Sequence, residues 1–312
     1  MEKHSRHLGV PAMAAAAFLW SIAGLFIKII DWHPLTIAGV RSSIAALVIF
    51  LYLKRPNIHG GRGPRLRLGI RFRRTRPWLI STGECLSFPQ LAASLSYAAT
   101  MILFVSANKL TTSSNAIILQ YIGPIFTAFL GAWILKERAK IEHWIAFLFV
   151  AAGIALMFLD TLGGGRLAGD LLALLSALAF SLTFVFMRMQ KDGSPLESML
   201  LAHGVTAVIG LSVSLFLPAP HLTAKALASV AVLGIFQVGL AAVLFSYAMK
   251  HVTAVTANLV AVIEPVFNPL WVFLALGEIP GPKSIAGGAV IIIAVTAASV
   301  INARRLCEPA SP

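Results

Sequence analysis

Residues 258–271 read NLVAVIEPVFNPLW and place a carboxylate, an amide and two prolines in an otherwise apolar stretch. Glu264 and Asn268 are four residues apart, so a helix would present both side chains on one face. Pro265 and Pro269 cannot donate a backbone hydrogen bond, and each therefore frees a carbonyl one turn earlier. A carboxylate beside freed carbonyls can hold a proton or bind the cationic group of a substrate.

The residues around Glu264 indicate the free-energy cost of placing a charged carboxylate there. The chain is apolar on both sides of it, from 254 to 277. A carboxylate at the centre of a membrane costs about 2.5–3.5 kcal/mol, so such an acid should face the interior of a helix bundle. Two interpretations stay open: a site for protons or cations, and a protonated or hydrogen-bonded acid that only holds helices together.

Polar residues of other apolar stretches can line the same site. Arg41 lies about six residues inside a predicted helix, ~9 Å deep at about 1.5 Å per residue. It can bind a substrate carboxylate, form a structural ion pair or extend toward the membrane surface. Gln120 and Tyr121 come just before Gly123 and Pro124, where the helix should break.

The remaining candidates are amides, aromatic rings and one histidine. Aromatic rings attract cations, although Trp and Tyr in membrane helices also serve as packing residues or interface anchors. An asparagine can simply bond across helices, and His203 is either a proton relay or a structural histidine. The candidate wall residues are Trp20, Tyr97, Gln237, Tyr247 and Asn258.

The sequence predicts neither an enzyme nor a bound cofactor or metal. GGGRLAG at 163–169 lacks the Lys-Ser of a phosphate-binding loop, and the chain has no HExxH, GxSxG or Walker sequence. Cys85 and Cys307 are far apart and have no metal-ligand spacing. The missing Walker sequence also argues against transport driven by ATP.

The composition indicates whether the chain folds in water or in a membrane. Of its 312 residues, 58% are apolar and 12% are charged, and the mean hydropathy is +0.85. Globular domains carry about 25% charged residues, whereas runs of about 20 apolar residues cross membranes. We therefore expect an all-α polytopic membrane protein. Ten runs predict transmembrane helices at 10–30, 35–53, 91–108, 112–135, 142–159, 167–189, 196–217, 227–249, 254–277 and 283–302.

The positive charges predict the orientation. When the N-terminus is placed in the cytoplasm, cytoplasmic segments hold 19 of the 25 Lys and Arg, outer loops four and the spans two. The positive-inside rule then predicts that both termini are cytoplasmic, in a multi-pass protein of the cell membrane. Because topology accounts for the net charge of +13, we do not expect nucleic acid as a partner.

One connection is unusually long and basic. Residues 54–90 include HGGRGPRLRLGIRFRRTRP. The simpler interpretation is a cytoplasmic loop that is disordered or lies on the surface. The alternative is that 54–76 contact anionic lipid headgroups.

The chain contains two copies of one unit. Residues 97–137 match 238–278 at a constant offset of 141, and residues 18–28 match 178–188 at an offset of 160. Five spans per unit is an odd number, so the second copy must enter the membrane upside down. Inverted repeats are typical of transporters that rock around a midplane site. We expect the repeats at 8–160 and 161–303, followed by a tail at 304–312.

The order of several motifs resembles the drug/metabolite transporter superfamily, specifically its EamA-type ten-helix members. The motifs are FLWSIAGLFIK, VRSSIAAL and SANKLTTSSNAIILQYIGPIFTAFLGAWILKE, with an echo that ends EPVFNPLWVFLALGE. The resemblance spans about residues 10 to 302, although the long basic loop departs from the family's short connection. It implies a central cavity between the repeats and the export or import of amino acids, sugars, choline-like amines or drugs. Arg41 matches an arginine common at this place in the family.

We therefore expect a secondary transporter, an exporter, of small organic metabolites such as amino acids, amines or drugs, working by alternating access. Protons are the candidate coupling ion. The counterpart of Glu264 in the first repeat is Gly123, so the acid breaks the internal symmetry, which indicates a specific task. The alternative is a membrane sensor or assembly protein that kept the fold without transporting.

Overall fold

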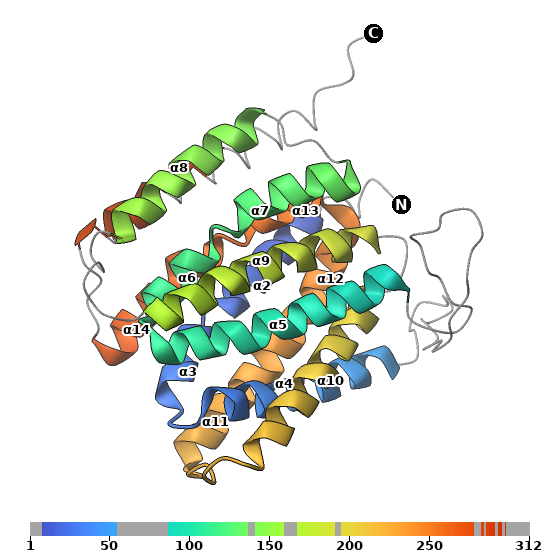
Figure 1. Cartoon of the computed structure of the whole chain (residues 1–312), viewed down its shortest axis with the longest axis vertical. Coiled ribbons are helices and arrows are strands. Elements are labelled where there is room, and N and C mark those ends of the chain that lie inside the picture. Colours follow the sequence, from blue (N-terminus) through green and yellow to red (C-terminus); the bar gives the residue numbers. More distant parts are fainter. Residues whose placement is uncertain are drawn as a thin grey trace.

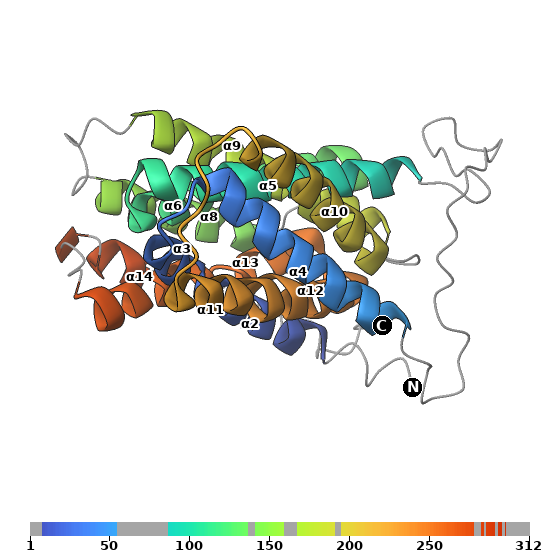
Figure 2. The same cartoon turned by 90° about the horizontal axis from the view of Figure 1, so that it is seen from below.

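The structure is a computed structural model that describes residues 8–54, 87–136, 141–158, 167–190 and 195–277, with short helical stretches between 282 and 297. Every regular element in these ranges is a helix. The helices lie side by side with similar axis directions, as the two perpendicular views in Figure 1 and Figure 2 show. The all-α class is confirmed for the described part of the chain.

Among the described residues, seven helices are long and apolar enough to cross a membrane, and two shorter apolar helices lie at Gly123–Leu135 and Trp144–Gly153. Half of the tenth predicted span, 283–302, falls outside the described residues, as does most of the basic loop 54–90. The tail 304–312 falls outside them entirely. The seven long helices are Gly9–Ile29, Pro34–Leu53, Phe88–Leu110, Leu167–Met189, Pro195–Ser214, Ala224–His251 and Ala254–Ala275.

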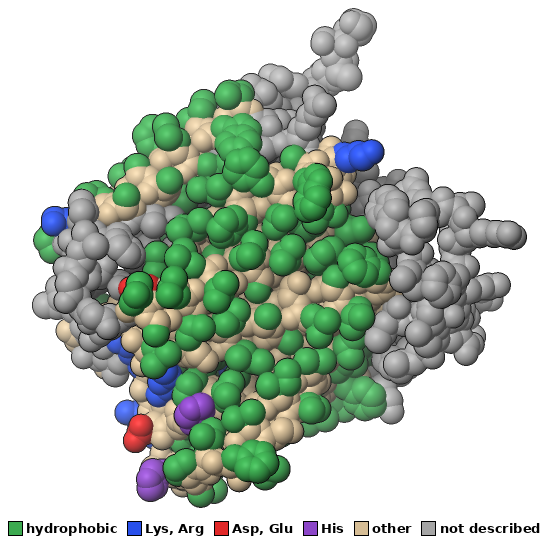
Figure 3. Space-filling view, in the orientation of Figure 1, with side chains coloured by type: hydrophobic (Ala, Val, Ile, Leu, Met, Phe, Trp, Pro, Cys, Tyr) green, Lys and Arg blue, Asp and Glu red, His purple; other side chains and the backbone are tan. Residues whose placement is uncertain are grey.

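Apolar side chains cover the outside of the helix bundle. In Figure 3 they spread across the visible face, and the Lys and Arg side chains lie toward its edges. Large side chains project from this exterior: Leu148 is 71% exposed and Leu274 is 65% exposed. Hydrocarbon chains solvate such a surface and water does not, so the chain is a multi-pass membrane protein.

In the N-terminal half, the first and fourth predicted spans are each divided into shorter helices. The fourth ends in a π-helical turn, η1. The described helices of this half are α2 (Gly9–Trp20), α3 (Ala23–Ile29), α4 (Pro34–Lys54), α5 (Phe88–Leu110), α6 (Ser113–Gln120), α7 (Gly123–Leu130), η1 (Gly131–Leu135) and α8 (Ile141–Phe158).

In the C-terminal half, the third span contains a π-helical segment, η2, and the fourth is again divided. The described helices of this half are α9 (Leu167–Met189), α10 (Pro195–Ser214), α11 (Ala224–Val232), η2 (Leu233–Leu240), α12 (Ala241–His251), α13 (Ala254–Val260) and α14 (Ile263–Leu276).

Helices of the two repeats end at equivalent residues. α5 ends at Leu110 and α12 ends at His251, which is 141 residues later. The same offset separates the left-handed residues that cap the fourth spans, Lys136 with φ 56° and Gly277 with φ 70°. The internal repeat read from the sequence is thus also a repeat of secondary structure.

The two repeats run through the bundle in opposite directions. The start of α2 lies against the end of α12, because Gly9 packs onto His251. The end of α9 lies on the same side, where Arg188 Nη1 donates to the Met249 carbonyl over 3.3 Å. α2 and α9 open equivalent first spans, yet one begins where the other ends. Which side faces the cytoplasm stays a prediction from the charges.

The second spans, α4 and α10, cross at two glycines. A Cβ on Gly210 would lie 2.7 Å from Gly39 Cα, and one on Gly39 would lie 2.9 Å from the Gly210 carbonyl carbon. Real Cβ atoms do not approach other atoms so closely, so the crossing needs glycine at both positions. Arg41, two residues after Gly39, lies on a different face of α4 and is fully buried.

Prolines break the fourth spans. The α6–α7 break is Tyr121–Ile122, and the α13–α14 break is Ala261–Val262. Pro124 follows the first break and Pro265 follows the second, and neither can donate an N–H to the carbonyl four residues earlier. These two breaks were predicted from the prolines.

The first span also breaks, at Ser21–Ile22, which the sequence did not predict. Ser21 Oγ donates to the Phe18 carbonyl over 2.6 Å and accepts from Trp271 Nε1 over 2.9 Å. A serine hydroxyl bonded to the preceding turn competes with the helix ladder and bends the helix. This signal is local and common, so it does not stand out in a sequence.

Candidate functional site

A buried cavity lies where helices of both repeats converge. It has about 20 Å³ of space, which is room for about one water molecule. The first repeat contributes side chains from α2, α4, α5 and α6, and the second contributes side chains from α9, η2 and α14. The lining residues are Trp20, Arg41, Tyr97, Thr100, Met101, Phe104, Gln120, Phe180, Gln237 and Glu264.

The cationic side of the cavity is Arg41, whose side chain is fully buried. Its Nη1 donates to Gln237 Oε1 over 3.2 Å, and its Nη2 lies 3.4 Å from Met101 Sδ. The Nε–H has no partner among the described residues. A weak sulfur contact and an unused N–H leave the guanidinium able to bind a carboxylate, its preferred partner.

The acidic side is Glu264, in the first turn of α14 and only 4% exposed. Tyr121 Oη lies 2.8 Å from Glu264 Oε2 and 2.5 Å from the Ala261 carbonyl oxygen. This carbonyl is available because Pro265, four residues later, has no N–H to donate. The carboxyl therefore lies at the α13–α14 break and is held by a residue of the α6–α7 break.

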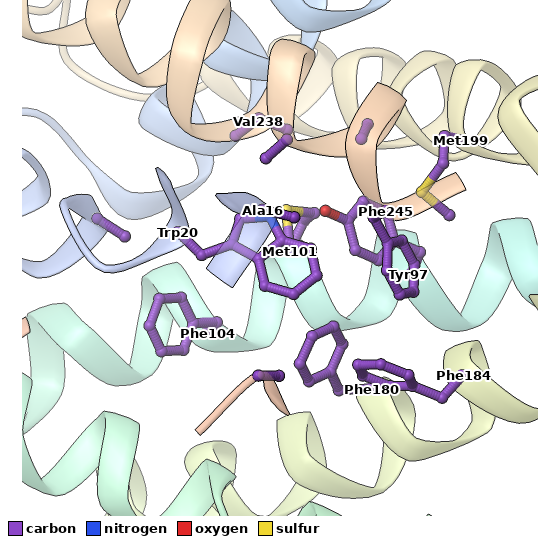
Figure 4. Packing of buried hydrophobic residues seen from close by; sticks show 14 of the residues in the cluster. Ala16, Trp20, Tyr97, Met101, Phe104, Phe180, Phe184, Met199, Val238 and Phe245 are labelled. Carbon is purple, nitrogen blue, oxygen red and sulfur yellow. The ribbon is translucent and has the colours of Figure 1, made fainter. Parts of the chain in front are cut away.

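Aromatic rings form an apolar wall. Trp20 meets Phe180 and Phe245 edge-on, with ring centroids 5.5 and 5.3 Å apart. Phe184 joins them, at 4.8 Å from Phe180 and 5.1 Å from Phe245. Figure 4 shows these rings gathered beside Tyr97. Edge-to-face contacts are an arrangement that aromatic pairs prefer, so the four rings pack together as one apolar surface.

Further polar atoms of the lining lack partners. Gln120 Nε2 donates to Ser176 Oγ over 2.9 Å. In contrast, Tyr97 Oη and Trp20 Nε1 are buried and make no hydrogen bond within the described part of the chain. Tyr97 packs edge-on against His203, at 5.4 Å between centroids. Because buried polar atoms normally have partners, these two atoms are available to a bound molecule or to water.

Two predicted candidates make contacts between repeats without lining the cavity. Tyr121 reaches it only through Glu264. Asn258 Nδ2 donates to Thr127 Oγ1 over 2.5 Å, which joins α13 to α7. This is the interhelical bond that was the second interpretation of Asn258.

Two other candidates lie away from the cavity. Asn268 is fully buried with its amide packed against Gly24, where a larger residue would collide with Asn268 Oδ1. Tyr247 is 37% exposed and is not among the lining residues. Pro269 was also predicted to break its helix, and this prediction is wrong, because the backbone of α14 continues through residue 269. Its side chain falls outside the described part of the structure.

The sequence analysis missed part of the lining: Thr100, Met101, Phe104 and Phe180. Two signals could have found them. The α5 residues follow Tyr97 at helical spacings of three, four and seven, so they share its face. Phe180 is the counterpart of Trp20 at the offset of 160 found between the first spans.

The lining chemistry suits binding. Within the described residues, no three His, Cys, Asp or Glu side chains are close enough to hold a metal ion. The lining offers one guanidinium, one carboxyl, two amides and several aromatic rings. A few polar groups among apolar ones are the usual lining of a site for a small molecule.

Inverted helical repeats that enclose a polar cavity between them are the architecture of a membrane transporter. The EamA-like transporter family matches residues 7–159 and 167–300, which correspond to the two repeats. The chain therefore belongs to the EamA-like transporter family.

Individual proteins are similar over long stretches. An uncharacterized transporter of Clostridium kluyveri is 27% identical over 231 residues, which cover 71% of this chain and 73% of that protein. Solute carrier family 35 member G1 of Mus musculus is 30% identical over 156 residues, 48% of this chain and 36% of the mouse protein. One crystal structure matches with a TM-score of 0.70 at 19% identity, over 96% of this chain and 98% of the other, and supports the fold alone.

Proposed function

We propose that this chain is a secondary transporter that moves small zwitterionic or cationic metabolites, such as amino acids and amines, across the cytoplasmic membrane by alternating access. The observation that carries the proposal is that a buried guanidinium, Arg41, and a buried carboxyl, Glu264, line one cavity between inverted repeats. Of the two directions open to the family, the proposal takes export.

The guanidinium, the carboxyl and the aromatic ring of the lining support the proposed substrate class. Arg41 suits a carboxylate, Glu264 suits an ammonium group, and the ring of Trp20 attracts cations and packs against apolar side chains. A molecule with an amino group, a carboxylate and an apolar part would use all three. An amine without the carboxylate would use two of them.

Alternating access follows from the size of the cavity. About 20 Å³ of space cannot hold an amino acid, so the walls must separate before a substrate enters. Because the walls come from both repeats, a rocking motion of one repeat against the other opens the cavity to one side at a time. The buried charges are then never exposed to both sides together.

A proton is the proposed coupling ion. Glu264 is the only acid of the lining, and a buried carboxyl costs far less when it is protonated than when it is charged. Substrate and proton can therefore compete for one site. Competition of this kind makes export of a substrate depend on uptake of a proton.

The test is flux in proteoliposomes. Purified protein is reconstituted and screened for uptake of labelled amino acids, amines, sugars and organic acids, with and without a pH gradient. We expect amino acids or amines to be transported and Glu264→Gln to abolish the effect of the gradient. Tyr52→Phe, a change at a half-exposed position on α4, is the control for reconstitution.

A thermal-shift screen with the same compounds is an independent measure of binding, because a ligand that binds the folded state raises the Tm. Flux of sugars or organic acids alone would contradict the proposed substrate class. No flux across the panel, with intact folding, would favour the alternative of a sensor or assembly protein.

A further inference from the structure

The Tyr121 hydroxyl has two close oxygen partners but only one hydrogen. Its Oη lies 2.5 Å from the Ala261 carbonyl and 2.8 Å from Glu264 Oε2. A carbonyl oxygen can only accept, so a full hydrogen bond at this distance uses the tyrosine proton. The contact with Glu264 is then a second hydrogen bond only if the carboxyl is protonated and donates to Tyr121.

A charged Glu264 changes the partner of this proton. A carboxylate cannot donate, and a hydrogen bond to a charged acceptor is roughly twice as strong as one to a neutral acceptor. The Tyr121 proton would then turn from the Ala261 carbonyl to the carboxylate. Pro265 supplies no N–H in its place, and the carbonyl keeps only the Glu264 N–H, which reaches it over 2.9 Å.

We infer that Tyr121 is the positioning residue that couples protonation of Glu264 to the bend at the α13–α14 break. The inference rests on the proposed function for its purpose, since it says how a coupling proton moves a helix. In the proton-loaded state, Glu264 donates to Tyr121 and Tyr121 ties the first repeat to the Ala261 carbonyl. When the proton leaves Glu264 for solvent, the Tyr121 hydroxyl donates to the carboxylate instead. The hydrogen bond from Tyr121 to the Ala261 carbonyl is then lost.

Tyr121 lies where a change in its hydrogen bonds can act on both broken helices. It belongs to the α6–α7 break, which Pro124 causes, and Ala261 belongs to the α13–α14 break. A helix bends most easily where its ladder is already interrupted. One side chain therefore connects the two most deformable points of the fourth spans, one in each repeat.

Other titratable groups surround Glu264. Arg41 from α4 and Tyr97 from α5 act on it electrostatically, and Arg41 also acts on His203 from α10. Of the helices packed against α14, α2 and α6 carry no charged side chain, and α3 carries Lys28 near its end. Any change with pH must therefore be assigned to Glu264 by substitution.

The experiment measures helix position against pH with no substrate present. Spin labels are attached to cysteines at Leu274 on α14 and Leu175 on α9, both exposed, after Cys85 and Cys307 are replaced by serine. Distances between the labels are recorded in lipid nanodiscs from acidic to alkaline pH. The proteins compared are the wild type, Glu264→Gln, Tyr121→Phe and the control Tyr52→Phe.

We expect the wild type and Tyr52→Phe to change their distance distribution with pH. Glu264→Gln should keep the acidic distribution throughout, because its amide donates to Tyr121 as the protonated acid does. Tyr121→Phe should lose the pH-dependent shift. A wild-type distribution that ignores pH, or a Tyr121→Phe protein that shifts like the wild type, would overturn the inference. So would a Glu264→Gln protein that still shifts.

Infrared spectroscopy tests the same inference without relying on the Tyr121 variant. The wild type should show a protonated carboxylic acid band at acidic pH that disappears at alkaline pH and is missing in Glu264→Gln. A wild type without that band would contradict a proton-loaded Glu264. Neither measurement uses a substrate, so absence of flux with an intact Tyr121-dependent shift would reject the proposed function alone.

Discussion

Tyr121 and Glu264 meet across the interface between the repeats, with Oη and Oε2 2.8 Å apart, although they lie 143 residues apart in the chain. Each residue sits at or beside a helix break, and a proline three residues or one residue later accounts for each break. The contact therefore joins the broken fourth spans of the two repeats. We infer that this contact responds to the protonation of Glu264.

Replacing the guanidinium of Arg41 should selectively weaken the binding of ligands that carry a carboxylate. Arg41→Lys replaces a planar fork by a point charge, and hydrogen bonds to charged groups contribute about 1.5–3 kcal/mol. We expect affinity for a transported amino acid to fall by roughly tenfold or more, and affinity for the matching amine without a carboxylate to change much less. Calorimetric titration of both ligands checks this, and equal losses would contradict a carboxylate partner for Arg41.

The glycine crossing of α4 and α10 should tolerate no side chain. Gly210→Ala places a Cβ within 2.6 Å of the Leu35 carbonyl oxygen, and overpacking of this kind costs typically about 1–3 kcal/mol. Its matched control is Gly204→Ala on the same helix, where nothing lies within 4 Å. That change should stabilise the helix by about 0.5–1 kcal/mol. Tm values in detergent should move in opposite directions, and two similar Tm values would refute the close crossing.

Restoring the missing N–H should straighten the α13–α14 break. Pro265→Ala gives the Ala261 carbonyl a backbone donor that competes with Tyr121. We expect a higher Tm and a lower rate of transport, because the helix gains a bond and loses its bend. Pro34→Ala is the control, since a proline at the first residue of α4 replaces no helix bond. Unchanged transport in Pro265→Ala would show that the break is not needed.

The bond from Asn258 to Thr127 should be worth little despite its short distance. Hydrogen bonds between membrane helices average about 0.6 kcal/mol, with a maximum near 1.7 kcal/mol. A double-mutant cycle with Asn258→Ala and Thr127→Val, measured by SDS unfolding, should give a coupling energy in that range. A coupling energy near zero would mean that the two side chains are not bonded in the membrane.

The charge pattern predicts which residues face each side. Lys225 and Lys250 lie at opposite ends of the segment α11–η2–α12, and both are exposed. After Cys85 and Cys307 are replaced by serine, Lys225→Cys should react with an impermeant maleimide on intact cells. Lys250→Cys should react only after the cells are permeabilised. The reverse pattern would invert the predicted topology.

Much of the site was visible in the sequence because polar residues are expensive in hydrocarbon. Arg41, Gln120, Gln237 and Glu264 stand out for that reason, and the structure brings them to one cavity. The apolar lining did not stand out, since Met101 and Phe180 look like any other residue of an apolar helix. Tyr247 was chosen by residue type alone, and residue type does not say which face of a helix it occupies.

The sequence by itself determined the membrane environment, the all-α class, the internal repeat and the helix breaks at Pro124 and Pro265. Each of these depends on composition, on spacing along the chain or on a missing N–H, which are local properties. Only the tertiary structure decided that Tyr121 faces Glu264, that α4 and α10 touch at glycines, and that the first span bends at Ser21. These contacts depend on how helices rotate and cross, and that is set by the packing of all side chains together.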